Sequence, residues 1–157
     1  MRKSVYLDST IFSYLFDERE SLKQFVDITK IWWNTQRSRY RLFISGETLA
    51  EINEGDYPNK NQVEKEAVKI EVLPQVIEVE LAAKAYVESL LMPQKVEGDA
   101  IHLAFASVYE MDFLLTWNCN HLANANKKQH IKIINGRLGL KVPEIITPMQ
   151  LFKEDNL

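Results

Sequence analysis

Three acidic residues, far apart in the chain, lie where predicted elements begin or end. Asp8 directly follows the apolar run 5–7, Glu51 lies in a helical segment after the apolar run 42–44, and Asp99 opens a helical segment rich in small residues. Carboxylates that converge repel one another and raise each other's pKa, so a hard cation stabilises such a pocket. Oxygen ligands favour Mg²⁺ or Mn²⁺. The matching chemistry is attack of metal-activated water on a phosphodiester.

Each acid also has an interpretation without chemistry. Asp8 can cap the helix that starts at Ser9, because Asp and Ser are favoured at that position. Taken alone, Asp8 is as well explained by a cap as by the usual ligand address outside the carboxyl end of a strand. Glu51 can be an ordinary solvated helix residue, and Asp99 can simply suit the positive end of a helix dipole.

Apolar runs alternate with helical segments along the chain. Strands are predicted over residues 5–7, 42–44, 71–74, 113–116 and 144–146. Helices are predicted from residue 9, over 21–39, 45–52, 61–70, 78–91, 99–108 and 122–128, and from residue 147, with a loop over 95–98. This alternation predicts a mostly parallel sheet with helices on both faces, hence a three-layer α/β/α sandwich. Pro74 places the third strand at an edge, and no linker divides the single domain 1–157.

Composition excludes several classes of protein. The only cysteine, Cys119, excludes an internal disulfide framework and a thiolate metal site. No apolar run reaches the roughly 18 to 20 residues that cross a bilayer, and no signal peptide is visible, so a cytoplasmic location is expected. Phosphate-binding glycine loops, the G-x-S-x-G elbow and the H-E-x-x-H zinc motif are all missing.

Several further residues have open roles at this stage. The net charge of −3 does not indicate nucleic-acid binding by itself, but the basic stretch 127–141 can contact RNA if it borders the acids. His102 shares a helix face with Asp99 and is expected to be an ordinary packed or hydrogen-bonded histidine. Trp32 and Trp33 are expected to pack in the core and at its rim.

Two other residues are candidates for contacts beyond the acids. Glu47 shares a helix face with Glu51 and is a candidate to support it. Trp33 and Phe152 are candidates for exposed contacts with a second copy or a partner protein.

Four segments taken together resemble the PIN domain family. They are VYLDST at 5–10, the stretch from Ser45 to Ile52, DAIHLA at 99–104 and LLTWNCNH at 114–121. The resemblance covers nearly the whole chain, in matching order and spacing. It implies a parallel α/β/α sandwich with metal-dependent ribonuclease activity. Single-domain PIN proteins of this size resemble the VapC-type toxins of bacterial toxin–antitoxin pairs.

The resemblance also implies roles for particular residues. By position, Asp8, Glu51 and Asp99 match the family's catalytic and metal-binding acids, and Thr10 and Thr116 match hydroxyl residues beside them. Asn118 stands where many members carry a fourth Asp. Its carbonyl oxygen can assist a Mg²⁺ or Mn²⁺ ion but brings no negative charge. The implied partners are RNA, an antitoxin protein and a second copy in a homodimer.

Asn118 keeps a second hypothesis open, in which the chain is a catalytically weak or silent PIN-like module that binds RNA or a protein. A third hypothesis is a phosphatase of the haloacid dehalogenase type, which also begins with an Asp at a strand end. That family requires a second Asp two positions on, where this chain has Thr10.

Overall fold

The computed structural model describes residues 1–89 and 97–152, apart from the side chain of Glu97. Its strands form one five-stranded sheet in the order β3-β2-β1-β4-β5, and each neighbouring pair is parallel. The strands are β1 (Ser4–Leu7), β2 (Arg41–Ser45), β3 (Glu71–Leu73), β4 (Phe113–Leu115) and β5 (Glu144–Ile146). The predicted parallel sheet is confirmed, and β3 lies at an edge as Pro74 indicated.

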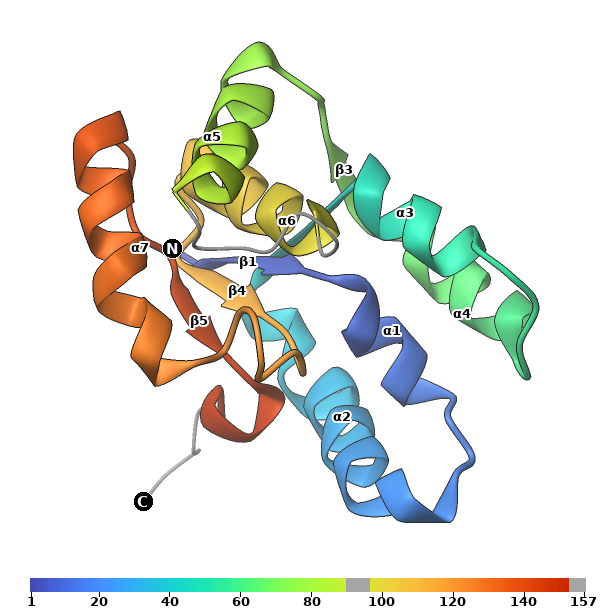
Figure 1. Cartoon of the computed structure of the whole chain (residues 1–157). Helices are drawn as coiled ribbons and strands as arrows, with labels where there is room; N and C mark the ends of the chain where they lie inside the picture. Colours follow the sequence, from blue (N-terminus) through green and yellow to red (C-terminus); the bar gives the residue numbers. More distant parts are fainter. Residues whose placement is uncertain (90–96, 153–157) are drawn as a thin grey trace.

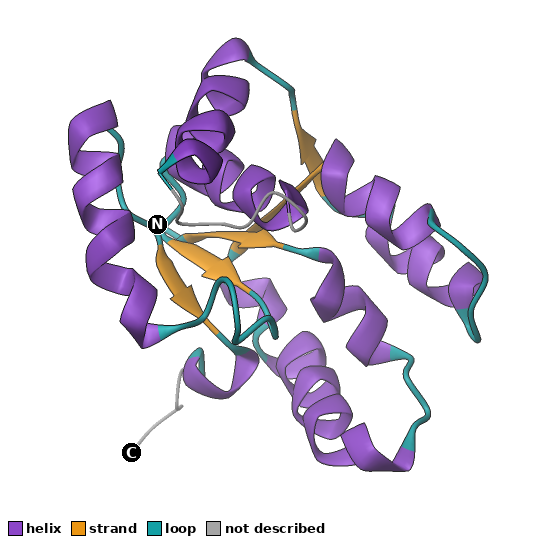
Figure 2. Ribbon diagram, viewed as in Figure 1, coloured by secondary structure: helices purple, strands orange, loops and turns teal. Residues whose placement is uncertain are grey.

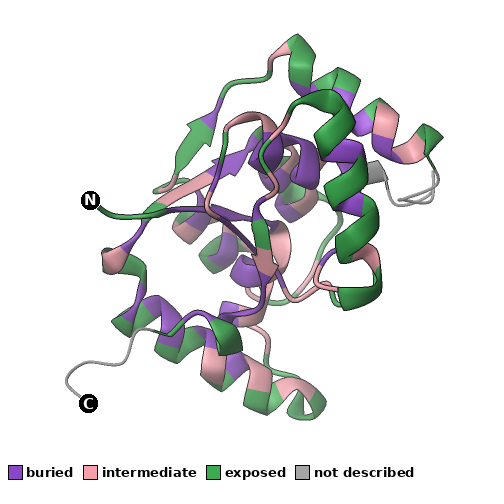
Figure 3. Cartoon of the chain, turned by 90° about the vertical axis from the view of Figure 1, so that its left-hand side faces the viewer, coloured by how far each residue is buried: buried purple, intermediate pink, exposed green. Residues whose placement is uncertain are grey.

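Strand β1 occupies the centre of the sheet because it is apolar on both faces. Val5, Tyr6 and Leu7 are each 0% exposed. Val5 and Leu7 pack into one hydrophobic core and Tyr6 into the other, as the alternation of side chains along a strand requires. Figure 3 shows this buried strand region inside a shell of more exposed helices.

Helices cover both faces of the sheet (Figures 1 and 2), which gives the three-layer α/β/α sandwich. One layer contains α1 (Ser9–Leu15), α2 (Lys23–Thr35) and α4 (Lys60–Ala67), and the other contains α5 (Ile77–Glu88), α6 (Glu97–Val108) and α7 (Ala125–Leu138). Helix α3 (Gly46–Asn53) contacts both α4 and α6. Short 3₁₀ turns are η1 (Glu20–Leu22), η2 (Arg37–Arg39) and η4 (Pro148–Gln150).

The predicted helix over 122–128 is wrong in its extent. Helix α7 begins after Asn124, whose side chain accepts a hydrogen bond from the Asn126 backbone N–H, and it continues to Leu138. Gly139 then adopts a positive φ of 71° and ends the helix. The sequence predicts too short a helix because most of its residues are polar. Its buried residues are only Ile131, Ile134 and Asn135, so the helical pattern of apolar residues is weak.

Other helix ends differ by smaller amounts. The segment predicted as one helix over 21–39 is α2 flanked by 3₁₀ turns, and α6 begins at Glu97, so Gly98 is helical rather than part of a loop. The remaining positions of the predicted loop, 95 and 96, and the end of the predicted helix 78–91 at 90 and 91 lie outside the described residues. Of the predicted terminal helix the structure describes only η4.

The two adjacent tryptophans belong to the core, as predicted, but Trp33 is not an exposed contact residue. Trp32 is 0% and Trp33 is 4% exposed. The Trp33 indole N–H donates to Glu66 Oε1 at 3.1 Å, so a polar partner is available where the ring reaches the rim. Phe152 is 40% exposed, as expected.

None of the helices in the described ranges is long and apolar enough to cross a lipid bilayer.

Asp112, in the turn before β4, is hydrogen-bonded to Ser4 at the start of β1. Its Oδ2 accepts from the Ser4 backbone N–H at 2.9 Å and its Oδ1 accepts from Lys141 Nζ at 2.9 Å. The Ser4 N–H and the Lys141 ammonium hold the pKa of Asp112 below its ordinary value. A carboxyl with a depressed folded pKa stabilises the fold above its unfolded pKa of about 3.9, and that contribution disappears as the pH falls through the folded value.

We therefore expect Asp112→Asn to lower the free energy of unfolding by about 1 kcal/mol at neutral pH. The difference from wild type should shrink as the pH falls below about 4, because the wild-type carboxyl then becomes protonated. Urea unfolding across this pH range measures both. Asp56→Asn in an exposed loop is the matched control, and a loss in Asp112→Asn that is equal at all pH values would contradict the assignment.

Candidate functional site

The candidate site lies where the strand order changes direction. From β1 the chain moves outward to β2 and β3, and from β4 it moves outward to β5 on the other side. Open α/β sheets bind ligands at such a switch point, outside the carboxyl ends of the two strands. Asp8 directly follows β1, and Thr116 directly follows β4. The two residues therefore meet at the position where ligands bind in this architecture.

Asp8 is both a helix cap and a member of the polar site. It is 2% exposed, and its Oδ1 accepts from the Thr10 backbone N–H at 3.0 Å and from the Thr10 hydroxyl at 2.5 Å. Its Oδ2 accepts a hydrogen bond from the Thr116 hydroxyl. Thr10 and Thr116 thus lie beside Asp8, as predicted, and fix the carboxylate from two elements.

Glu51 and His102 form the central contact of the site. His102 Nε2 lies 2.5 Å from Glu51 Oε1, and His102 Nδ1 lies 2.6 Å from the Tyr6 hydroxyl. That hydroxyl is also 2.7 Å from Ser45 Oγ at the start of α3. A continuous polar chain therefore links β1, α6 and α3. His102 is packed and hydrogen-bonded as expected, but its contact with Glu51 was not predicted.

The surroundings of His102 favour its charged form. Burial lowers the pKa of His102, but the interaction with Tyr6, the hydrogen bond to Glu51 and the charges of Glu51 and Asp8 outweigh burial and raise that pKa well above its ordinary value. Burial raises the pKa of Glu51, but the hydrogen bond and charge of His102 and the hydroxyl of Ser9 hold it below its ordinary value. Both shifts favour the charged forms of the two groups, which gives the contact the character of an ion pair.

Asn118 both holds Asp99 and shapes the turn after β4, which is the role without chemistry that its residue type also allows. Asn118 Nδ2 donates to Asp99 Oδ2 at 2.9 Å. Asn118 Oδ1 accepts from the backbone N–H groups of Asn120 at 3.2 Å and His121 at 3.1 Å. The carbonyl oxygen thus shapes the turn after β4, and the amide group faces the acid. An Asp at this position would repel Asp99 unless a cation lay between them.

Gly98 allows the acids of α3 to approach the start of α6. A Cβ added at Gly98 would lie 2.9 Å from Glu51 Oε2 and 3.2 Å from Glu47 Oε1. Burial raises the pKa of Asp8 and of Asp99, and the negative charge of Glu51 raises both further. Of the three predicted acids, Glu51 alone contacts His102 among the described residues, Asp8 and Asp99 act on it through their charges, and Glu47 lies close to Glu51 at Gly98.

The acids suit a divalent cation chemically, but their present arrangement does not form a metal-binding group. Three carboxylates supply the oxygen donors that Mg²⁺ and Mn²⁺ prefer. Across residues 1–89 and 97–152, however, no three His, Cys, Asp or Glu side chains are placed to share an ion. The hydroxyls of Thr10 and Thr116 engage Asp8, and His102 engages Glu51. A cation would therefore require these side chains to rotate and exchange partners.

Within the basic stretch 127–141, the described interaction with a predicted acid is that of Lys127 with Asp99. Burial lowers the pKa of Lys127 in the first turn of α7, while the charge of Asp99 opposes this. Lys141, by contrast, pairs with Asp112 at the other end of the sheet. The charge interaction with His121 lowers the pKa of Asp99. The buried Nδ1 of His121 has no hydrogen-bond partner among the described residues. Lys127 is thus the residue of the basic stretch whose charge acts together with that of Asp99.

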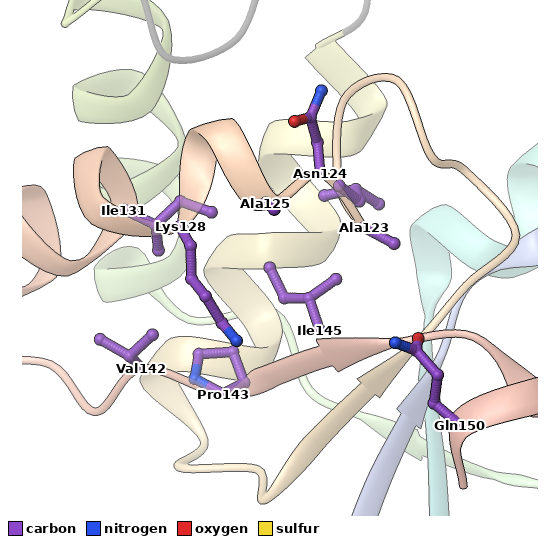
Figure 4. A pocket seen from close by; sticks show the side chains of 10 residues that line it. Ala123, Asn124, Ala125, Lys128, Ile131, Val142, Pro143, Ile145 and Gln150 are labelled. Atoms are coloured by element: carbon purple, nitrogen blue, oxygen red, sulfur yellow. The ribbon is translucent and has the colours of Figure 1, made fainter.

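Two hollows lie near this region, and only one reaches an acid. A groove of about 750 Å³ has Glu51 in its wall, and its other walls include Phe16, Asp17, Glu54 and Tyr57. A smaller pocket of about 180 Å³ lies between α7 and β5 and is lined mainly by apolar side chains (Figure 4), with Lys128 and Gln150 among its polar members. None of the predicted acids lines the smaller pocket, so the groove is the approach to Glu51.

A scan against models of known protein families and a search of curated proteins both returned no match to this chain. The resemblance to the PIN domain family therefore rests on the four sequence segments and stays a hypothesis.

We expect Tyr6→Phe to lower the free energy of unfolding by about 1–3 kcal/mol, because it leaves buried polar atoms of His102 and Ser45 without their shared partner. Chemical denaturation measures the change. Tyr109→Phe is the matched control, since its hydroxyl donates to the Pro74 carbonyl in an exposed region, and its effect should stay within about 0.5 kcal/mol. Equal effects of the two substitutions would show that the buried chain contributes nothing specific.

Proposed function

We propose that the chain is a metal-dependent endoribonuclease of the PIN type that hydrolyses RNA phosphodiester bonds. The proposal assigns Asp8, Glu51 and Asp99 to holding Mg²⁺ or Mn²⁺, which when bound activates water and stabilises charge on the phosphate. The observation that supports it is the run of hydrogen bonds at the switch point of the sheet that joins Asp8 through Thr116 and Asn118 to Asp99, with the charge of Glu51 acting on both acids.

The residues around each acid fit a division of roles. Thr10 and Thr116 hold Asp8 in one orientation, which suits the acid that would contact the ion most directly. His102 holds Glu51 as a carboxylate. Asn118 engages Oδ2 of Asp99, so Oδ1 is the oxygen assigned to accepting the proton of the attacking water.

The biological setting follows the family resemblance. We propose that the protein acts in the cytoplasm as the toxin of a toxin–antitoxin pair, with an antitoxin protein as partner and a homodimer as its assembled state. Lys127, beside Asp99, supplies a local positive charge for the RNA backbone despite the net charge of −3. A small overlapping reading frame for a DNA-binding protein next to this gene is the simplest genetic support.

Asp8→Asn is expected to abolish metal-dependent cleavage of RNA while the chain stays folded, because the amide keeps the shape but loses the negative charge. Cleavage of a mixed-sequence RNA with Mn²⁺ measures the activity, and circular dichroism checks the fold. Asp27→Asn on the exposed side of α2 is the control, since Asp27 pairs with Lys23 on the surface, and it should cleave like wild type. Unchanged cleavage by Asp8→Asn would remove the assignment.

A second candidate is a catalytically silent PIN-like module that binds RNA or a protein. Two observations favour it: the acids of the described ranges do not form a metal-binding group, and the Asn118 carbonyl oxygen is engaged by backbone donors. The two candidates differ in their need for an ion.

Titration calorimetry with Mn²⁺ separates the two candidates. The nuclease proposal expects saturable binding at millimolar Mn²⁺ in wild type, binding lost in Asp99→Asn, and unchanged binding in the exposed Asp56→Asn control. Absence of any binding in wild type would favour the silent module.

A further inference from the structure

Two aromatic rings lie stacked at the rim of the acid site. The ring centroids of Tyr14 and Trp117 are 5.6 Å apart with an interplanar angle of 13°. Phe25 meets the Trp117 indole edge-on, at 5.2 Å and 67°. All three side chains are partly exposed. A group of partly exposed aromatic rings beside a polar site differs from the fully buried rings that fill the two cores.

Trp117 is fixed in place by hydrogen bonds at both its backbone and its ring. Its backbone N–H donates to Thr10 Oγ1 at 2.9 Å, and its indole N–H donates to Thr29 Oγ1 at 2.8 Å. The Thr29 hydroxyl donates in turn to the Phe25 carbonyl at 2.6 Å. The indole therefore forms a rigid support for the face of the Tyr14 ring that it contacts, and the opposite face of that ring is called the outer face. Rings that are already ordered lose little conformational entropy when a ligand covers them.

The same hydrogen bonds connect this pair to the acids. The Thr10 hydroxyl that accepts from Trp117 also donates to Asp8 Oδ1 at 2.5 Å. Trp117 stands in the sequence between Thr116, which bonds Asp8, and Asn118, which bonds Asp99. Burial raises the pKa of Tyr14, and Asp8 is among the charges that raise it further. The stacked pair is therefore joined through Thr10 to the acid that the proposal assigns to the metal ion.

We propose that an unpaired nucleobase next to the scissile phosphate stacks on the outer face of Tyr14, with Trp117 supporting the ring from behind. This inference rests on the proposed ribonuclease function, because that function places the phosphate at the acids. It names single-stranded RNA as the substrate class, since a base within a duplex is already stacked on both faces.

Electrostatics explain why such a contact is needed. Asp8, Glu51 and Asp99 repel a phosphodiester, and the chain as a whole has a net charge of −3. Base–aromatic stacking contributes about 1–3 kcal/mol per base and is tolerant of sequence. It therefore supplies affinity next to acids whose charge opposes binding of the phosphate.

The test compares Tyr14→Leu, which removes the ring, with Tyr14→Phe, which keeps it. Binding of a fluorescent single-stranded oligoribonucleotide is measured by anisotropy in EDTA, so that the readout does not depend on cleavage. We expect Tyr14→Leu to weaken binding about 10-fold or more, and Tyr14→Phe to stay within about 2-fold of wild type. A double-stranded version of the same oligonucleotide should bind all three proteins equally weakly.

A second measurement keeps the test valid if Tyr14→Leu does not fold. Oligonucleotides in which one base at a time is removed, leaving its phosphate, are bound to the wild-type protein. Removal of the base at one position should weaken binding to the wild-type protein about 10-fold. For Tyr14→Leu, where it is folded, removal of a base should have no such effect at any position.

The outcomes separate the two proposals. Equal single-strand binding by Tyr14→Leu and wild type, with wild-type RNA cleavage intact, overturns stacking and leaves the nuclease. Tyr14-dependent binding without any cleavage by wild type supports stacking and overturns the nuclease. If base removal weakens binding at none of the positions, the stacking proposal is overturned, even when the wild-type protein cleaves RNA.

Discussion

The contact between a buried histidine and a carboxylate organises this site. His102 and Glu51 meet at 2.5 Å, with the second ring nitrogen of His102 against the Tyr6 hydroxyl. A carboxylate removed from water is unfavourable unless it is paired. Because the imidazole supplies that partner, Glu51 can lie beside Asp8 and Asp99. Without it, the charge of Glu51 would act on Asp8 and Asp99 with no imidazole to offset it.

The contact between His102 and Glu51 is one of several by which the chain itself provides partners for the carboxylates, where a metal site would have a cation. Hydroxyls of Thr10 and Thr116, the imidazole of His102 and the amide of Asn118 all point at carboxylate oxygens. Each supplies part of the positive potential that a divalent cation would otherwise supply. The acids are thus stable together in this form, and an incoming ion would compete with partners that the chain itself provides.

The sheet could be predicted from the sequence because a strand buried on both faces leaves a local signature. Residues 5–7 and 113–115 are short apolar runs, and Pro74 indicated the edge strand. Helix α7 was harder because its few buried residues are separated by lysines, histidine and asparagine, so its pattern of apolar residues is weak.

The candidate site was predicted only in part. The three acids stand at recognisable places along the chain, but Tyr6 and Glu51 lie 96 and 51 positions from His102. No local pattern reports such a contact. The orientation of the Asn118 amide likewise depends on Asp99, which precedes it by 19 positions. The stacked pair of Tyr14 and Trp117 is also a contact between distant segments, and only the structure reveals it.

Gly98 has a consequence for how α3 and α6 can vary. The backbone at this position lies against the carboxylate ends of Glu51 and Glu47, and even a methyl group there would come within 2.9 Å of an oxygen. A side chain there would displace the two flexible carboxylate ends rather than the helices, and Glu51 would have to move away from the imidazole of His102. The hydrogen atom that Gly98 carries in place of a side chain therefore leaves the room in which the carboxylates of α3 meet the start of α6.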